Sequence, residues 1–124
     1  MRDFATFVQT RVEPIPGWML REAALLTAWL ARAQRAIGVA GPTLEIGTFK
    51  GKYLSVLYRL SDADRPVVGV DLFVGAQDKT AAAEVVRTNV AAACGDASRL
   101  RIVIADSMEG FAEDVAARAK LGGV

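Results

Sequence analysis

Three acidic residues and a glycine-bearing turn are spaced along the sequence in a way that could surround one ligand. Glu45 precedes the turn at 47–51, and Asp71 and Asp106 each end a later aliphatic segment. In open α/β sheets, ligands bind beyond the carboxyl ends of the strands. If the three segments are strands of one sheet, the three acids meet at one crevice. Each acid could instead cap a neighbouring helix, but their shared position at segment ends favours a ligand site.

The turn itself distinguishes between cofactors. A dinucleotide-binding turn reads G-x-G-x-x-G, so that backbone amides can approach a pyrophosphate at a helix N-terminus. Here three residues separate Gly47 from Gly51, and Phe49 stands where another glycine would be needed. Glu45 would repel a pyrophosphate, but it suits a ligand with a cationic sulfonium, a protonated amine and ribose hydroxyls. S-adenosylmethionine is such a ligand.

The elements that position these residues alternate between strand and helix. The pattern predicts a strand at 43–46, a helix running through Leu60, a strand at 67–70 that leads into Asp71, a helix at 79–93, a strand at 100–105 that leads into Asp106, and a last helix that stops before Gly122. This order is typical of an α/β fold in which a parallel sheet is covered by helices on both faces.

The residues ahead of the first strand are predicted to be helical. Pro14, Pro16 and Gly17 divide 1–17 into a short turn of helix and a bend. Apolar residues then recur at helical spacing over 18–37, which predicts an amphipathic helix stopped at Gly38. The apolar residues are Leu26, Trp29, Leu30, Ala33 and Ile37. We therefore divide the chain into an N-terminal helical segment, 1–38, and an α/β segment, 39–124.

The α/β segment resembles the first three motifs of class I S-adenosylmethionine-dependent methyltransferases. The matching stretches are 44–52 (LEIGTFKGK), 68–71 (VGVD) and 101–107 (RIVIADS), and the first is closest to the branch that reads E-I-G-[ST]-aromatic-x-G-[KR]. The resemblance covers roughly residues 40–112. It implies a Rossmann-like fold of which only the first three strands are present, and a methyltransferase that acts on an oxygen atom of a small molecule.

The resemblance also implies roles for individual residues. Gly47 and Gly51 would let the backbone pass under the methionine part of the cofactor, and Glu45 would hold its amino group, directly or through water. Asp71 would accept hydrogen bonds from the ribose hydroxyls. The other implied contacts are Thr48 and Phe49 in the turn, Asp106 and Ser107 at the amino edge of the adenine, and Phe73 or Met108 beside the adenine ring.

Class I methyltransferases continue into a fourth strand, whose end often carries a metal-binding aspartate, and then into strands that shape the acceptor pocket. Those elements are not found within these 124 residues, so we nominate no catalytic residue and no metal ligand. Any divalent metal would be held by residues beyond this chain. The strand at 43–46 would be an exposed edge, and we expect a longer parent chain, a completing chain or a homo-oligomer to pair with it.

Composition narrows the remaining functional classes. A net charge of +1 gives no field that would recruit nucleic acid or an anionic membrane surface, and no apolar stretch is long enough to span a bilayer. With Cys94 as the single cysteine and no histidine, we expect a metal-poor cytoplasmic protein. Two alternatives stay open. One is an NAD(P)-binding oxidoreductase domain, because Asp71 follows Gly47 by 24 residues (71 minus 47), and the other is a non-catalytic α/β module.

Overall fold

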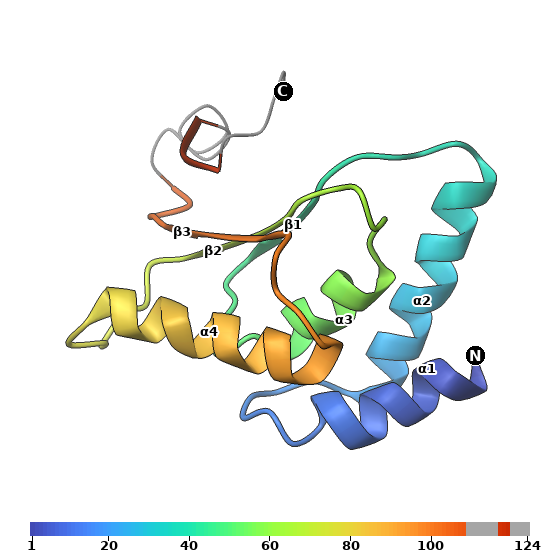
Figure 1. Ribbon diagram of the computed structural model, residues 1–124, viewed down its shortest axis with the longest axis horizontal. Helices are drawn as coiled ribbons and strands as arrows, with labels where there is room; N and C mark the ends of the chain where they lie inside the picture. Colours follow the sequence, from blue (N-terminus) through green and yellow to red (C-terminus); the bar gives the residue numbers. More distant parts are fainter. Residues whose placement is uncertain (109–116, 120–124) are drawn as a thin grey trace.

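A computed structural model describes residues 1–108 and 117–119, in which helical elements come first and strands then alternate with helices (Figure 1). In chain order the elements are α1 (Arg2–Phe7), the π-helical segment η1 (Val8–Val12), α2 (Arg21–Ala36), β1 (Thr43–Ile46), α3 (Lys52–Leu60), β2 (Val67–Asp71), α4 (Lys79–Cys94) and β3 (Leu100–Ile104). The predicted strands are confirmed to within one residue. The last helix predicted before Gly122 falls mostly on residues outside the described ones.

The three strands form one parallel sheet in the order β1-β2-β3. Glu45 of β1 lies opposite Gly69 of β2, which in turn lies opposite Ile102 of β3. The central strand, β2, is aliphatic and almost fully buried, as a strand with a neighbour on each side requires. Within the described residues β1 pairs only with β2, so β1 has an open edge, as the sequence predicted.

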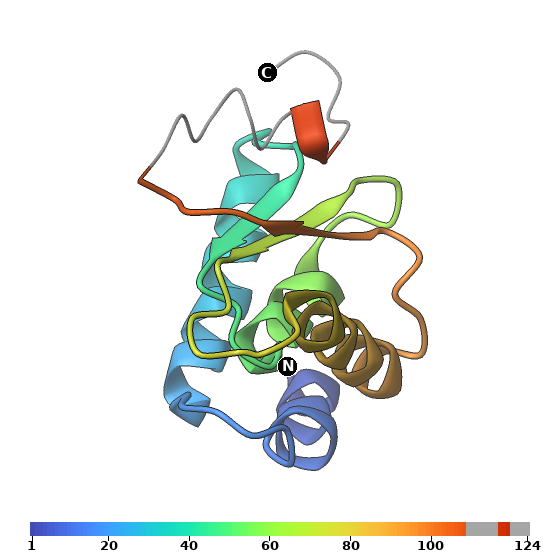
Figure 2. The same cartoon turned by 90° about the vertical axis from the view of Figure 1, so that its left-hand side faces the viewer.

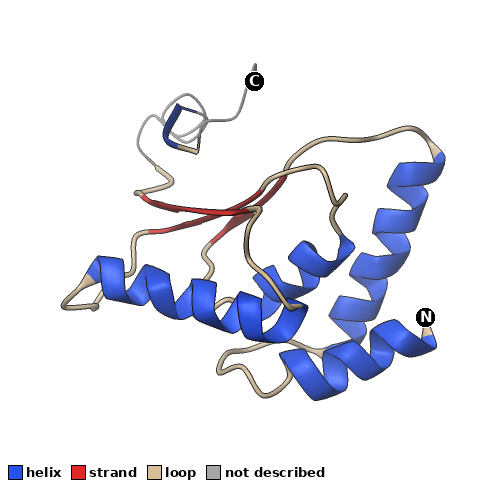
Figure 3. Ribbon diagram, viewed as in Figure 1, coloured by secondary structure: helices blue, strands red, loops and turns tan. Residues whose placement is uncertain are grey.

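Helices α3 and α4 pack side by side against one face of the sheet (Figures 2 and 3). The core between them and the sheet consists of buried residues from α3, α4, β2 and β3, among them Leu54, Tyr58, Val67, Val86, Val90 and Leu100. On the opposite face, Val68, Val70 and Val103 cluster with Ala119. The layered α/β fold is therefore confirmed. Within the described residues, the helices that cover the sheet, α3 and α4, lie on one of its faces.

The N-terminal helix is longer than predicted. It runs without a break through α1 and η1, and Val8 and Val12 are fully buried. Together with Phe7 they form a second core against Val56 of α3 and Ala24 of α2. Sequence reasoning gave weight to the prolines after this stretch and overlooked the helical spacing of its own apolar residues.

Helix α2 begins later than predicted and buries a different face. Its buried residues are Ala24 and Ala28, because small side chains allow α2 to pack closely beside α3 and η1. The apolar stripe identified in the sequence is exposed, with Trp29 at 68% and Leu30 at 56%. The helix ends as predicted, with Gly38 at a φ of 79°. None of the helices in the described part of the chain combines the length and apolarity of a membrane span.

Candidate functional site

The carboxyl ends of the three strands form a groove of about 190 Å³. The residues that line it leave β1, β2 and β3 at the same edge of the sheet: Ile46, Gly47, Val70, Asp71, Leu72, Ala105, Asp106 and Ser107. Parallel strands place their ends together in this way, which is why ligands of open α/β sheets bind there. Four residues that the sequence singled out, Gly47, Asp71, Asp106 and Ser107, are thus brought together.

The two glycines of the turn at 47–51 have different surroundings. A Cβ atom on Gly47 would meet no atom within 4 Å, so this backbone faces open space at the groove. A Cβ atom on Gly51 would lie 3.1 Å from Val86 Cγ1 and 3.3 Å from the Val86 carbonyl oxygen. Gly51 therefore lets α3 pack close to α4. Both have positive φ, 82° and 88°, where glycine is unstrained.

Thr48 is turned toward the sheet. Its side chain is 4% exposed and lies over β2, where a Cβ atom on Gly69 would come within 2.7 Å of Thr48 Cγ2 and 2.9 Å of Leu54 Cδ2. Only glycine at position 69 lets the turn pack this closely on the strand. Sequence reasoning missed Gly69, although a lone glycine inside a strand often marks a close approach of this kind.

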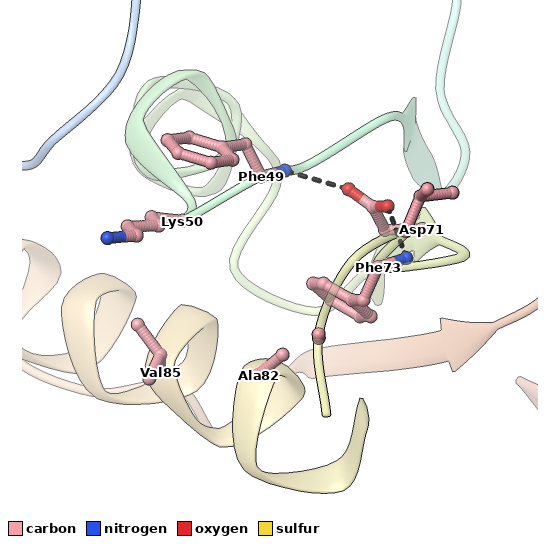
Figure 4. Close-up of a pocket in the computed structure, with 8 residues that line it drawn as sticks. Phe49, Lys50, Asp71, Phe73, Ala82 and Val85 are labelled. Atoms are coloured by element: carbon pink, nitrogen blue, oxygen red, sulfur yellow. Dashed lines mark hydrogen bonds between the residues drawn. The ribbon is translucent and has the colours of Figure 1, made fainter. Parts of the chain in front are cut away.

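Asp71 joins the turn after β1 to the turn after β2. Its Oδ2 accepts a hydrogen bond from the Phe49 amide at 2.9 Å, and its Oδ1 accepts one from the Phe73 amide at 2.8 Å (Figure 4). Phe49 and Phe73 have φ values of 48° and 52°, which are uncommon for bulky side chains. Oδ2 also accepts a long hydrogen bond, of 3.5 Å, from the Thr48 hydroxyl. One carboxylate thus holds both turns, and its Oδ1 keeps a further lone pair for a ligand donor.

Glu45 carries one carboxyl oxygen that lacks a partner in the described part of the chain. It lies two residues before Gly47 on the helix-covered face of β1, and its Oε1 is buried with no hydrogen-bond partner among the described residues. Burial, and then the charge of nearby Asp71, raise the pKa of Glu45 from 4.5 to about 7. Both causes disfavour the ionised carboxylate, so a cationic group bound beside it would be stabilised.

The residue after Asp71 that faces the groove is Leu72. Phe73, predicted to flank an adenine ring, is 7% exposed and packs in the core with Leu54 and Val86. Phe73 lies beyond the end of β2 and has a φ of 52°, so strand alternation does not set the direction of its side chain, which packs in the core.

Asp106 caps the turn that follows β3. Its Oδ1 accepts a hydrogen bond from the Met108 amide at 2.9 Å, and Asp106 lines the groove together with Ser107. Met108 is 89% exposed and does not line the groove. Across residues 1–108 and 117–119, no three acidic or cysteine side chains gather as a metal site would require.

The chain was compared with protein families, curated proteins and solved structures, and only the solved structures gave matches. No protein-family model matches the chain, and no curated protein matches it. Among solved structures, the chain is similar to the O-methyltransferase TomG from Streptomyces achromogenes, involved in tomaymycin synthesis and in complex with SAM (24% identity, TM-score 0.57, 74% of this chain and 36% of that one). It is also similar to a protein from Klebsiella pneumoniae described as a candidate O-methyltransferase (19% identity, TM-score 0.61, 95% of this chain and 48% of that one).

A third similar structure is cofactor-bound Rv0187 from MTB (25% identity, TM-score 0.57, 87% of this chain and 44% of that one). The chain therefore spans less than half the length of each of the three structures. At these identities the likeness concerns the course of the backbone. The chain has the Rossmann-like α/β fold of class I S-adenosylmethionine-dependent methyltransferases.

Proposed function

We propose that this chain is the cofactor-binding part of an S-adenosylmethionine-dependent methyltransferase that methylates an oxygen atom of a small molecule. The observation that carries the proposal is the buried, unpartnered Oε1 of Glu45, two residues before the open backbone of Gly47. A carboxylate with a pKa raised to about 7 needs a cationic partner to ionise fully at neutral pH. The ammonium group of the cofactor would be that partner.

Glu45 is not among the residues that line the groove at the strand ends. The residues that do line it fit the remaining parts of the same cofactor. Asp71 Oδ1 has a free lone pair for a ribose hydroxyl, in addition to the Phe73 amide that it already binds. Asp106 and Ser107 offer polar contacts to an adenine edge, and Leu72 offers an apolar wall for its ring. When bound, the cofactor supplies an electrophilic methyl group on a sulfonium. The chain's own residues hold and orient it, and orientation is the main source of rate in such transfers.

The acceptor pocket and any general base belong, in this proposal, to a part of the working protein that lies outside this chain. The open edge of β1 and the exposed Leu44 and Ile46 next to it are where further strands would join. That part could be a continuation of the same polypeptide, a completing chain or a second copy. A small-molecule acceptor and a cytoplasmic location are part of the same proposal.

The alternative of a dinucleotide-binding domain is disfavoured by one contact. A pyrophosphate would need the free amides of the turn at 47–51, yet the Phe49 amide is already bound by Asp71. A negatively charged carboxylate therefore occupies the donor that a phosphate would require. Glu45 adds a second unfavourable charge.

Thermal unfolding in the presence of ligands tests the proposal. A ligand that binds only the native state raises the melting temperature, so S-adenosylhomocysteine should raise it and NAD should not. Gly47→Val is the control, because its side chain would fill the space over Gly47 and should remove the shift. Stabilisation by NAD alone would favour the oxidoreductase reading, and no shift with any nucleoside ligand would favour a non-catalytic module.

A further inference from the structure

A second cavity, of about 450 Å³, lies beside the groove, between the turn at 47–51 and helix α4 (Figure 4). Its lining is mostly apolar and comprises Phe49, Lys50, Asp71, Phe73, Val74, Ala76, Ala82 and Val85. It shares only Asp71 with the groove at the strand ends. Small-molecule sites typically enclose about 300 to 1,000 Å³ and combine apolar walls with a few polar groups. The cavity fits that description.

Two aromatic residues form walls of the cavity that are fixed in advance. In Figure 4 the ring of Phe73 points toward α4, from which Ala82 and Val85 point back toward the turn that carries Phe49. Asp71 holds the backbone amides of both phenylalanines, and the ring of Phe73 is also held by its packing in the core, so this wall exists without a ligand. A preformed slot lined by aromatic and aliphatic groups favours a flat aromatic ligand, because little ordering is needed on binding.

Lys50 gives the mouth of the cavity a positive charge. Its ammonium lies 5.5 Å from the centroid of the Phe49 ring, and in Figure 4 it extends away from Asp71. In the described part of the chain, no carboxylate lies within ion-pair distance of Lys50. Asp71, by contrast, accepts hydrogen bonds from the amides of Phe49 and Phe73 and from the Thr48 hydroxyl, so its carboxylate is directed toward these donors. An anionic group would therefore be attracted to the Lys50 side of the cavity.

We propose that this cavity is a second small-molecule site, which takes a flat aromatic molecule whose single carboxylate or sulfonate lies at Lys50. The aromatic body would lie between Phe73 and the Ala82–Val85 side of α4. The site is separate from the groove assigned to the cofactor, and it does not depend on methyl transfer.

Two fluorescent probes test the site. Anilinonaphthalene sulfonate has an aromatic body with one sulfonate, and phenylnaphthylamine has the same body without the charge. The variants are Lys50→Gln and Val85→Glu, with Thr88→Glu as the matched control, since Thr88 is also an exposed residue of α4 but does not line the cavity. Circular dichroism verifies that each variant is folded.

The structure predicts a distinct result for each variant. Val85→Glu should weaken binding of the sulfonate about tenfold, because it places a negative charge in the cavity, and Thr88→Glu should leave binding unchanged. Lys50→Gln should weaken binding of the sulfonate by about two- to fivefold, as expected for an exposed charge pair, without affecting the uncharged probe. The sulfonate should remain bound in the presence of saturating S-adenosylhomocysteine.

Equal binding by Val85→Glu and Thr88→Glu would show that the probe binds elsewhere, for example on the exposed apolar side of α2, and would overturn the proposal. Full displacement by S-adenosylhomocysteine would overturn it as well, because the cavity would then belong to the cofactor site. If S-adenosylhomocysteine does not bind while the probe results hold, the second site stands and the proposed function fails.

Discussion

Replacing Asp71 should destabilise the fold through the two backbone amides that its carboxylate holds. Both amides bind the same charged carboxylate, but they differ in exposure. The hydrogen bond of the exposed Phe49 amide should contribute about 1 kcal/mol, and that of the partly buried Phe73 amide about 1.5 to 3 kcal/mol. Asp71→Ala should therefore lower the free energy of unfolding by about 2.5 to 4 kcal/mol. Asp71→Asn keeps one acceptor and should lose about half of that.

Urea unfolding measures this difference, provided that the m-value stays constant across the variants. Asp78→Ala is the control, because Asp78 Oδ1 accepts a single amide, from Ala81 at 3.0 Å, as the N-cap of α4. Loss of such a cap costs about 0.5 to 2 kcal/mol. If Asp71→Ala is no more destabilising than Asp78→Ala, the carboxylate does not hold the two turns and the account of the site is wrong.

Three further predictions concern the groups around the same turn. The folded-state pKa of Glu45, about 7, lies above its ordinary 4.5, so the native state retains a proton that the unfolded chain loses. The free energy of unfolding should therefore fall by about 3 kcal/mol as the pH rises from 4.5 to above 7. Glu45→Gln should lack most of this fall when urea unfolding is compared at about pH 5 and about pH 8. An identical pH dependence in both proteins would show that burial does not raise the pKa of Glu45. Gly51→Ala should lose more stability than Gly47→Ala, because a Cβ atom at position 51 would press on Val86. Gly47→Ala should lose more affinity for S-adenosylhomocysteine. If calorimetry gives the reverse order, Gly51 and not Gly47 faces the cofactor. Gly69→Ala should lose about 1 to 3 kcal/mol, and Thr48→Ser should recover part of it by removing the methyl group 2.7 Å away; no recovery in the double variant would contradict the close approach.

The sequence was sufficient to predict the strands and their edge. Each strand is a short, mostly aliphatic run that contains an acid, ends in one or leads to one. Because such runs alternate with helices along the chain, a parallel sheet is the expected arrangement. Because parallel strands end together, the meeting of Gly47, Asp71 and Asp106 followed from their positions alone.

What could not be predicted depends on packing between elements distant in the sequence. The apolar stripe of α2 predicted a buried face. In the structure, the face that carries Ala24 and Ala28 is buried instead, and Trp29 remains exposed. The amide contacts of Asp71 follow from the positive φ of Phe49 and Phe73, which no local preference predicts. The cavity beside α4 likewise arises from the gap left between two turns and a helix.

A crystal structure of the protein with S-adenosylhomocysteine would show whether Glu45 and Asp71 bind the cofactor. We expect the ligand to lie in the groove at the strand ends, with its amino nitrogen within hydrogen-bond distance of Glu45 Oε1 and its ribose hydroxyls at Asp71. Ligand density elsewhere, or density in the groove with Glu45 Oε1 still lacking a partner, would contradict the assignment of Glu45 as the group that recognises the cofactor.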